Sequence, residues 1–295
     1  MDIRFLKTLV AIADQGSFAS AANSVGLSPS AVSMQIRALE VYLATEIFDR
    51  SHRPPILNQK GLALVPTARR IVSLHDTLRD AAGSPDQYAG SLRLGVIPTA
   101  LSSFVPGVLA GLRSAHPQIQ VEVVTGMNTP LFELLKNGQL DAAIIGEPPR
   151  LPRKLHWRSV IDEPICVIAR LDTPEESPEE LLRHHPYIKL VRGAWQLRMI
   201  DAHLAKARVA LNTVMQLDSI EAVALMVYNG LGVSIVPKRS IEPLLNFPLK
   251  WIPFGEPTLR RKLGFVYHHG SQKSHLLQAL YDEIAQTVNL SGRGQ

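Results

Sequence analysis

Apolar residues recur along this chain at two spacings, and the change between them divides it into two parts. From residue 3 to residue 82 the spacing is that of amphipathic helices, whereas from residue 92 onward short apolar runs alternate with helical stretches. Between them lies SPDQYAGS, residues 84–91, a polar segment with proline and glycine that is typical of a linker. The pattern predicts a helical N-terminal part and an α/β C-terminal part.

Two short helices are predicted before residue 27. The first carries apolar residues over Phe5–Ala13, and Gly16 can end it because glycine adopts the left-handed conformation readily. Ser17 can cap the second helix, and Gly26 ends it. A third helix follows directly, and two short helices joined by a tight glycine turn make a helix-turn-helix.

The third helix spans residues 27–43, LSPSAVSMQIRALEVYL. Ser28 can cap it, and Pro29 occupies the first helical position, where a missing N–H is harmless. One narrow apolar stripe is formed by Val32, Ile36, Leu39 and Leu43. The opposite side carries small hydroxyls and an arginine, which suits insertion into a DNA major groove, although an ordinary surface helix has the same pattern. The candidate DNA contacts of this helix are Ser28, Pro29, Ser30, Ser33, Met34 and Arg37.

A small β-hairpin, or wing, is predicted after the third helix, in EIFDRSHRPPILNQKG. Apolar pairs at 47–48 and 56–57 flank a polar tip that contains two prolines. Arg50 and Arg53 lie in this tip, where they can reach phosphate oxygens or the minor groove. We take both as candidate DNA contacts, against the alternative that they are merely solvated.

A long helix is predicted from residue 62 to residue 82, with Asn58 able to cap it and Pro66 expected to kink it. Its apolar positions have the spacing of a coiled-coil seam: Leu64, Ile71, Leu74, Leu78 and Ala81. Such a seam can pack against its own domain or against a second copy of the chain. We favour dimerisation, because no second apolar segment nearby remains to cover it.

In the remainder of the chain, strands alternate with helices, which predicts a parallel sheet flanked by helices. Strands are expected at 92–97, 119–125, 140–145, 165–169, 187–191, 214–217, 233–236 and 263–268. Helices are expected at 98–112, 129–138, 196–205, 219–230 and 274–288, with another starting at Ser177. The alternation forms two sets, and the chain is expected to cross between them near residues 161–165 and to return near residue 263.

Composition narrows the classes of protein that fit. The chain has 295 residues, 46% of them hydrophobic and 19% charged, so it is globular with room for two or three compact units. The single Cys166 excludes an intrachain disulfide and a cysteine-based zinc site, and we expect it to be a small buried apolar residue. No apolar run reaches membrane-spanning length and MDIRFLKTL lacks the features of a signal sequence, so we expect a cytoplasmic protein without a membrane partner.

The charge of the chain is compatible with nucleic-acid binding but too small to demonstrate it. The formal net charge is +5, with an isoelectric point near 9.4. Within residues 1–58, however, five Lys and Arg residues are matched by five Asp and Glu residues. DNA binding by this part would therefore depend on individually placed basic side chains rather than on bulk charge.

Enzymatic and metal chemistry find little support in the sequence. Ser102 and Ser103 have no placed histidine or acid in their sequence context, and no GxSxG occurs. The pairs His184-His185 and His268-His269 are adjacent, and neighbours on a strand face opposite ways, so neither pair is a chelate. Gly230-Leu231-Gly232 fits a helix end and a turn rather than a dinucleotide fingerprint. We predict no catalytic residues, no metal ligands and no cofactor.

The segment SFASAANSVGLSPSAVSMQIRALE, followed by LATEIFDR, a short wing and a long helix, resembles the N-terminal domain of the LysR-type transcriptional regulators. The resemblance extends over essentially the whole chain, although Pro29, Met34 and LNQKG depart from the family's usual residues at positions that include operator-reading ones. It implies a winged helix-turn-helix with a linker helix, then a bilobal α/β domain of the periplasmic-binding-protein type that binds a small effector. It also implies double-stranded operator DNA as a partner, a homodimer assembling to a homotetramer, and RNA polymerase as a further partner.

Effector contacts are expected at the carboxyl ends of strands, where open α/β sheets bind ligands. Thr99, Asn128 and Thr129 lie there, although threonine and asparagine also cap helices in many proteins. The resemblance makes Thr99 the best-matched position and adds Arg192 from the other lobe, and Ser102 completes the candidate set. No acidic residue occurs in IPTALSS or MNTP, and both segments start helices, so we expect a small anionic effector.

The domains predicted are a winged helix-turn-helix at 1–58, a linker and dimerisation helix with hinge at 59–90, and an effector-binding domain at 91–295. Within the last, lobe I takes 91–161 and 266–295, and lobe II takes 162–265. The predicted function is sequence-specific, effector-controlled regulation of transcription. The alternatives are a solute-binding protein, a cytoplasmic small-molecule-binding protein without a regulatory role, and an enzyme on the same fold.

Overall fold

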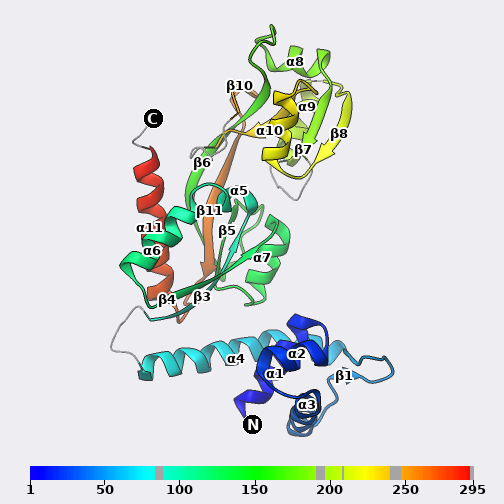
Figure 1. Ribbon diagram of the computed structural model, residues 1–295, viewed down its shortest axis with the longest axis vertical. Helices are drawn as coiled ribbons and strands as arrows, with labels where there is room; N and C mark the ends of the chain where they lie inside the picture. The colour runs from blue at the N-terminus through cyan, green and yellow to red at the C-terminus, as the bar shows by residue number, and fades with distance from the viewer. Residues whose placement is uncertain (84–88, 191–196, 208, 240–246, 293–295) are drawn as a thin grey trace. The chain divides into compact units, whose positions relative to one another are not determined.

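The computed structural model describes residues 1–83, 89–190, 197–207, 209–239 and 247–292. The chain forms two compact units, residues 1–90 with 136–139 and residues 91–135 with 140–295 (Figure 1). We refer to them as the N-terminal unit and the C-terminal unit.

The N-terminal unit contains the three predicted helices, the wing and the long helix. Its elements are α1 (Ile3–Gln15), α2 (Phe18–Val25), α3 (Pro29–Leu43), β1 (Phe48–Asp49), β2 (Ile56–Leu57) and α4 (Gln59–Gly83). Gly16 and Gly26 end α1 and α2 in the left-handed conformation, with φ of 70° and 68°. The hydroxyls of Ser17 and Ser28 accept backbone N–H groups at the starts of α2 and α3. The helix-turn-helix and its capping residues are therefore as predicted.

One buried cluster holds α1, α2 and α3 together. Ala21 and Ala22 of α2 are almost completely buried in the same cluster as Leu9 of α1 and Ile36 of α3. Small side chains on α2 let the neighbouring helices approach closely, and the large aliphatic side chains each contribute about 1.5–3 kcal/mol through burial. The packing fixes the back of α3 and so determines which of its residues face outward.

The long helix α4 is covered on one side only. Val65 and Ala68 are buried in the cluster of the N-terminal unit, where α4 packs against α1. Ile71 and Leu74 are exposed. The first interpretation is therefore correct in part, because α4 packs against its own unit. Dimerisation through the uncovered part of the seam stays a prediction.

The remaining predictions for α4 have mixed outcomes. Asn58 caps the helix as predicted, since its side-chain oxygen accepts the Gly61 N–H at 2.9 Å. Leu64 packs partly against the buried cluster instead of standing in an open seam. Pro66 lies inside the helix. The side chains of Leu78 and Ala81 lie outside the described residues.

The C-terminal unit is an α/β structure of two lobes. The first part of the chain forms β3 (Gly90–Val96), α5 (Pro98–Leu101), α6 (Val105–Ala115), β4 (Ile119–Thr125), α7 (Asn128–Lys136), β5 (Ala142–Gly146) and β6 (Leu155–Arg170). The second forms α8 (Pro178–His184), β7 (Tyr187–Leu190), α9 (Leu197–Ala207), β8 (Thr213–Leu217), α10 (Ile220–Tyr228), β9 (Ser234–Pro237) and β10 (Leu249–Pro253). The return to the first lobe is made by β11 (Arg260–His268) and α11 (Ser274–Gly292).

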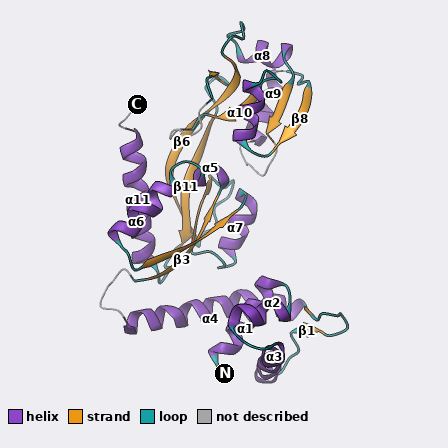
Figure 2. Cartoon of the chain, viewed as in Figure 1, coloured by secondary structure: helices purple, strands orange, loops and turns teal. Residues whose placement is uncertain are grey.

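Two long strands, β6 and β11, connect the lobes (Figure 2). They pair antiparallel with each other, and the strand order of the sheet is β10-β6-β11-β5-β3-β4, with β9 also paired to β6. One end of the strand pair belongs to the first lobe, with β5 beside β11, and the other to the second lobe, with β10 beside β6. The predicted crossings near 161–165 and 263 fall within these two strands.

The prediction of a parallel sheet is wrong in part. The pairs β3–β5 and β7–β8 are parallel, but β11 is antiparallel to both β5 and β6. The strands β6 and β11 carry the chain between the lobes in opposite directions, so side by side they must be antiparallel. The C-terminal unit is therefore a mixed α/β fold, with α6 and α11 lying side by side in the first lobe (Figure 1).

The predicted helix over 98–112 is broken after Leu101. Pro106 has no N–H to donate to the carbonyl of Ser102, so a continuous helix would leave that group without its bond. The hydroxyls of Ser102 and Ser103 instead donate to the carbonyls of Pro98 and Thr99, at 3.0 and 2.8 Å. The result is a single short turn, α5, followed by α6.

Candidate nucleic-acid interface and ligand cavity

The outward side of α3 carries the predicted candidates. Val32, Ile36 and Leu39 are buried, whereas Met34 is 68% exposed and Arg37 is exposed. Helical geometry also places Val41, which is exposed, on the same side as Met34 one heptad later. This side therefore offers one guanidinium and two apolar side chains, which match guanine edges and thymine methyl groups in a major groove.

The start of α3 is exposed, and its hydroxyls are engaged locally. Ser28 Oγ accepts the Ala31 N–H at 3.2 Å and lies 2.9 Å from Ser30 Oγ. Ser33 Oγ donates to the carbonyl of Pro29 at 3.0 Å. Each hydroxyl keeps at least one hydrogen or lone pair that is not used in these bonds, so these groups still suit contacts with phosphate or base edges.

The two arginines of the wing differ in their surroundings. Arg53 is exposed at the tip between β1 and β2. Arg50, by contrast, donates from Nη2 to Glu40 of α3 at 2.5 Å, although its side chain remains 47% exposed. Arg53 is therefore the candidate for direct contact at the tip, and Arg50 is fixed against the helix.

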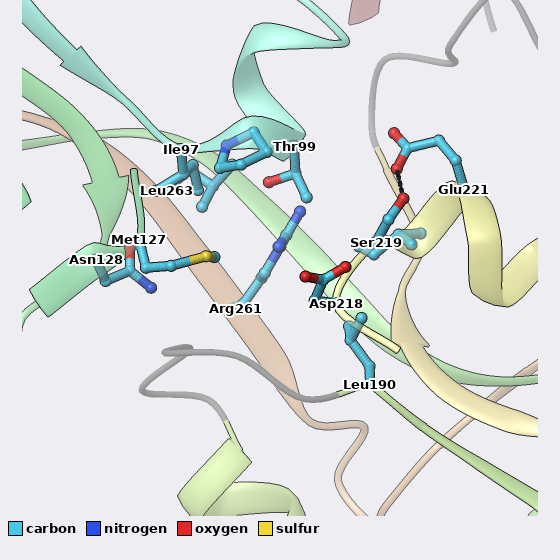
Figure 3. A pocket seen from close by; sticks show the side chains of 12 residues that line it. Ile97, Thr99, Met127, Asn128, Leu190, Asp218, Ser219, Glu221, Arg261 and Leu263 are labelled. Carbon is cyan, nitrogen blue, oxygen red and sulfur yellow. Dashed lines mark hydrogen bonds between the residues drawn. The ribbon is translucent and has the colours of Figure 1, made fainter. Parts of the chain in front are cut away.

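A cavity of about 100 Å³ lies between the lobes of the C-terminal unit (Figure 3). It is enclosed by residues that lead into α5, α7 and α10, together with two residues of β11 and one of β7. They are Ile97, Pro98, Thr99, Met127, Asn128, Leu190, Asp218, Ser219, Ile220, Glu221, Arg261 and Leu263. The carboxyl ends of strands and the starts of helices therefore meet here, as the sequence led us to expect.

Two polar groups in the cavity lack hydrogen-bond partners among the described residues. One is Thr99 Oγ1, which is buried. The other is Nη2 of Arg261, a side chain only 5% exposed that extends across the cavity toward Thr99 (Figure 3). Arg261 Nε donates to Glu163 at 2.6 Å, and Nη2 lies 2.6 Å from the same oxygen at a poor angle for a hydrogen bond. Both groups are available to a ligand.

Acidic residues of the second lobe also border the cavity. Glu221 accepts from Arg239 at 2.5 Å, from Ser219 at 2.7 Å and from Ser102 of the first lobe at 3.0 Å. Burial alone would raise the pKa of Glu221, but the hydrogen bonds from Arg239 and Ser219 lower it to about 2. Burial lowers the pKa of Arg261, and Glu163 opposes that shift. The cavity therefore holds positive and negative groups close together.

The predicted effector residues are distributed unevenly around this cavity. Thr99 and Asn128 line it, and the Asn128 side-chain oxygen also accepts the Gly146 N–H at 2.8 Å. Thr129 is exposed and does not line it, and Ser102 bonds to Glu221 across the lobes rather than lining it. Arg192 lies outside the described residues.

Four polar residues that line the cavity were not predicted from the sequence: Arg261, Asp218, Ser219 and Glu221. A signal for three of them existed, because a helix was predicted to start at Ser219 and helix starts gather at this edge. Arg261 gave no signal, since the first residues of β11 were not recognised as a strand. Only the return of the chain from the second lobe brings it into the cavity.

The structure also shows the surroundings of Cys166 and of the pair His184-His185, to which we assigned no function. Cys166 is 2% exposed, and burial raises the pKa of its thiol. His184 and His185 both lie near Glu175, at 3.7 and 3.1 Å. Within the described ranges no group of three or more His, Cys, Asp or Glu side chains is placed to hold a metal ion. No helix there combines the length and apolar character needed to cross a bilayer.

Two family models match the chain. Residues 3–62 match the bacterial regulatory helix-turn-helix proteins of the lysR family, and residues 85–289 match the LysR substrate binding domain. Among curated proteins, a probable RuBisCO transcriptional regulator of Cyanidium caldarium is 30% identical over 95% of this chain and 92% of its own length. A probable hydrogen peroxide-inducible genes activator of Mycobacterium avium is 28% identical over 96% of this chain and 93% of its own length.

Solved structures resemble the chain over its whole length. A full-length OxyR variant from Pseudomonas aeruginosa superposes with a TM-score of 0.73 at 24% identity, covering 97% of this chain and 98% of that one. Full-length CbnR complexed with its target DNA gives a TM-score of 0.65 at 18% identity, covering 97% and 100%. At these identities the likeness concerns the fold.

Proposed function

This chain belongs to the LysR family of bacterial helix-turn-helix regulators and is a DNA-binding transcriptional regulator with an effector-binding domain, and we propose which residues perform each task. We assign operator reading to α3 and the wing, and effector binding to the cavity between the lobes. The family membership favours this assignment over a small-molecule-binding protein without a regulatory role. Because the relatives are regulators, we assign no catalytic activity to the chain.

For DNA recognition, the observation that carries the proposal is the exposed side of α3. Its back is buried in the core of the N-terminal unit, so Arg37 and Met34 are presented on a rigid helix. We assign Arg37 to a base-edge contact and Arg53 to the phosphate backbone. The exposed serines at the start of α3 complete the interface, with Pro29 between them.

A gel-shift experiment with sheared genomic DNA tests this assignment and supplies the operator. Arg37→Ala should then weaken operator binding by about 1–3 kcal/mol and relax the sequence preference. Arg53→Ala should weaken all duplexes alike and reduce the salt dependence by about one counterion. Unchanged affinity and salt dependence in both variants would remove α3 and the wing from the interface.

For the effector, the observation that carries the proposal is that two buried atoms, Thr99 Oγ1 and Arg261 Nη2, have no hydrogen-bond partner among the described residues. Both can donate to an acidic group, so we propose a small effector with one anionic group bound there. The helix-start argument contributes little at Thr99, because α5 is only four residues long and its dipole is correspondingly weak. The carboxylates of Asp218 and Glu221 disfavour a second negative charge and suit a hydrogen-bond donor at the other end of the ligand.

Sensing by a thiol does not suit this chain, although some relatives are named for induction by hydrogen peroxide. Cys166 is its single cysteine, is almost completely buried and has a raised pKa. Oxidation to a disulfide needs a second thiol and an accessible thiolate. We therefore propose reversible, non-covalent binding of the effector, with no cofactor.

Assembly and location remain part of the proposal. The exposed Ile71 and Leu74 of α4 suit a homodimer contact, and we propose that dimers pair further into a homotetramer. A two-fold dimer would read two half-sites of a palindromic operator. Contact with RNA polymerase and a cytoplasmic location follow from the role in transcription.

A further inference from the structure

We propose that Glu40, which lies on the buried side of α3 and does not face DNA, positions the wing for DNA binding. The proposal rests on DNA binding by the N-terminal unit and adds a residue that acts through others. Glu40 is a positioning residue, because its carboxylate connects the recognition helix to the backbone and to an arginine of the wing.

The carboxylate of Glu40 makes two hydrogen bonds to the segment that contains β1, the first strand of the wing. Its Oε1 accepts the backbone N–H of Ile47 at 2.9 Å, and its Oε2 accepts Arg50 Nη2 at 2.5 Å. Glu40 is only 8% exposed, whereas Arg50 is half-exposed. The bonds therefore run from the interior of the unit outward to the surface that faces DNA.

The backbone at Glu46 and Ile47 is also held by residues at the start of α4. The carbonyl of Ile47 accepts the Asn58 N–H at 3.1 Å, and Asn58 Nδ2 donates to the carbonyl of Glu46 at 2.9 Å. Gly61 packs so closely here that a Cβ would collide with the carbonyl oxygen of Ile47. The base of the wing is thus fixed between α3 and α4.

A charged residue at this place needs a reason beyond packing. Burying a carboxylate is unfavourable unless it is paired and hydrogen-bonded, and an apolar side chain of similar volume often stabilises a core equally well. An apolar residue, however, would leave the N–H of Ile47 without this acceptor and Arg50 without its partner. The carboxylate therefore orders the wing before DNA arrives, which reduces the entropy lost on binding.

Glu40→Gln tests the proposal in the full-length chain, with Glu46→Gln as the matched control. The glutamine keeps an oxygen for the Ile47 N–H and removes the charge that holds Arg50. Glu46 is exposed and adjacent to Ile47, so its variant reproduces the general effect of one lost negative charge near DNA. Relative to Glu46→Gln, Glu40→Gln should bind an operator duplex about three- to tenfold more weakly, measured by fluorescence anisotropy.

A double-mutant cycle with Arg50→Gln separates positioning from general destabilisation. If Glu40 acts through Arg50, adding Glu40→Gln to Arg50→Gln should change the affinity by less than about twofold. An equal loss in both backgrounds, or equal affinities of Glu40→Gln and Glu46→Gln, would overturn the proposal. A wild-type protein that binds no duplex would instead overturn DNA binding itself.

Limited trypsin cleavage of the free protein provides a readout that does not depend on DNA. The bond after Arg50 should be cut several-fold faster in Glu40→Gln than in Glu46→Gln, since Arg50 is no longer held. Arg53 precedes Pro54 and is a poor trypsin site, so the cut after Arg50 is distinct. Should Glu40→Gln fail to fold, Arg50→Gln alone should speed hydrogen exchange of the wing amides, and unchanged exchange would overturn the proposal.

Discussion

The two units of this chain differ in how completely the buried polar groups at their proposed binding sites are hydrogen-bonded. In the N-terminal unit, Glu40 is bonded to Ile47 and Arg50, and the buried Arg69 of α4 donates from two nitrogens to Asp14 of α1. In the C-terminal unit, Thr99 Oγ1 and one nitrogen of Arg261 have no hydrogen-bond partner within the described part of the chain.

An unmet buried polar group costs about 1–3 kcal/mol, so it persists where a ligand supplies the missing bond. The N-terminal unit satisfies its buried charges internally and presents a rigid surface to DNA. The C-terminal unit leaves two groups of its cavity without a hydrogen-bond partner among the described residues, and under the proposed function an effector supplies the missing bonds. This difference fits the two proposed roles, operator recognition by the N-terminal unit and effector binding by the cavity of the C-terminal unit.

The largest effect on stability is expected from removing the charge of Arg261, which is paired with the buried Glu163. Arg261→Met leaves the buried Glu163 without this cation and should destabilise the C-terminal unit by about 3–5 kcal/mol, with loss of effector binding. All three tryptophans, Trp157, Trp195 and Trp251, belong to this unit, so denaturant unfolding followed by their fluorescence reports on it alone.

A second variant distinguishes the two roles of Arg261. Combining Arg261→Met with Glu163→Leu replaces the buried pair by apolar side chains and should restore most of the lost stability. Effector binding should stay absent, because the guanidinium that we propose as the contact for the anionic group is gone. Wild-type affinity in the double variant would exclude Arg261 from the site.

A smaller effect is expected in the N-terminal unit, at the side of α4 that exposes the apolar residues Ile71 and Leu74. Ile71→Asp with Leu74→Asp places like charges across the proposed two-fold contact and should raise the dimer dissociation constant by at least about a hundredfold. Sedimentation measures the change, and operator binding should fall with it. Leu62→Asp, at an exposed apolar position of the same helix outside the seam, should leave the dimer intact. Intact dimers in the first variant would place the contact elsewhere.

The sequence predicted the features that depend on neighbouring residues, and it did not predict those that depend on residues far apart in the chain. The helix-turn-helix was predictable because its signals are local, with Ser28 capping α3 and Gly26 ending the helix before it. Thr99 was found because it lies just after the end of a strand. The Arg261–Glu163 pair was not, because 98 residues separate its members and only the antiparallel return of β11 beside β6 brings them together. The Glu40–Arg50 pair depends in the same way on the geometry of the wing.

Removing one unmet group should have a modest and selective effect. Thr99→Val keeps the volume and deletes the hydroxyl, so effector binding should weaken by about 1–2 kcal/mol. The effector-free protein should be as stable as the wild type or slightly more so, since Oγ1 has no partner among the described residues. Calorimetry with the small carboxylates that a thermal-shift screen selects measures the first, and tryptophan fluorescence the second. If the valine variant binds the effector with unchanged affinity, Thr99 is not an effector contact, and Arg261 alone remains the proposed contact for the anionic group.

The smallest effect concerns Glu221, the satisfied acid at the edge of the cavity. Its pKa is lowered from 4.5 to about 2 in the folded chain, so its stabilising bonds are fully present above about pH 4.5 and are lost as the pH falls toward 2. Because its side chain is 44% exposed, solvent screening should keep the contribution below about 1 kcal/mol. The free energy of unfolding should therefore differ between wild type and Glu221→Gln at neutral pH, and the difference should shrink as the pH is lowered to about 3. Glu180→Gln, at an exposed acid of α8, controls for the general change in charge. A difference that stays constant over this range would mean that Arg239 and Ser102 bind the glutamine as well as the carboxylate, and that the charge of Glu221 does not stabilise the C-terminal unit.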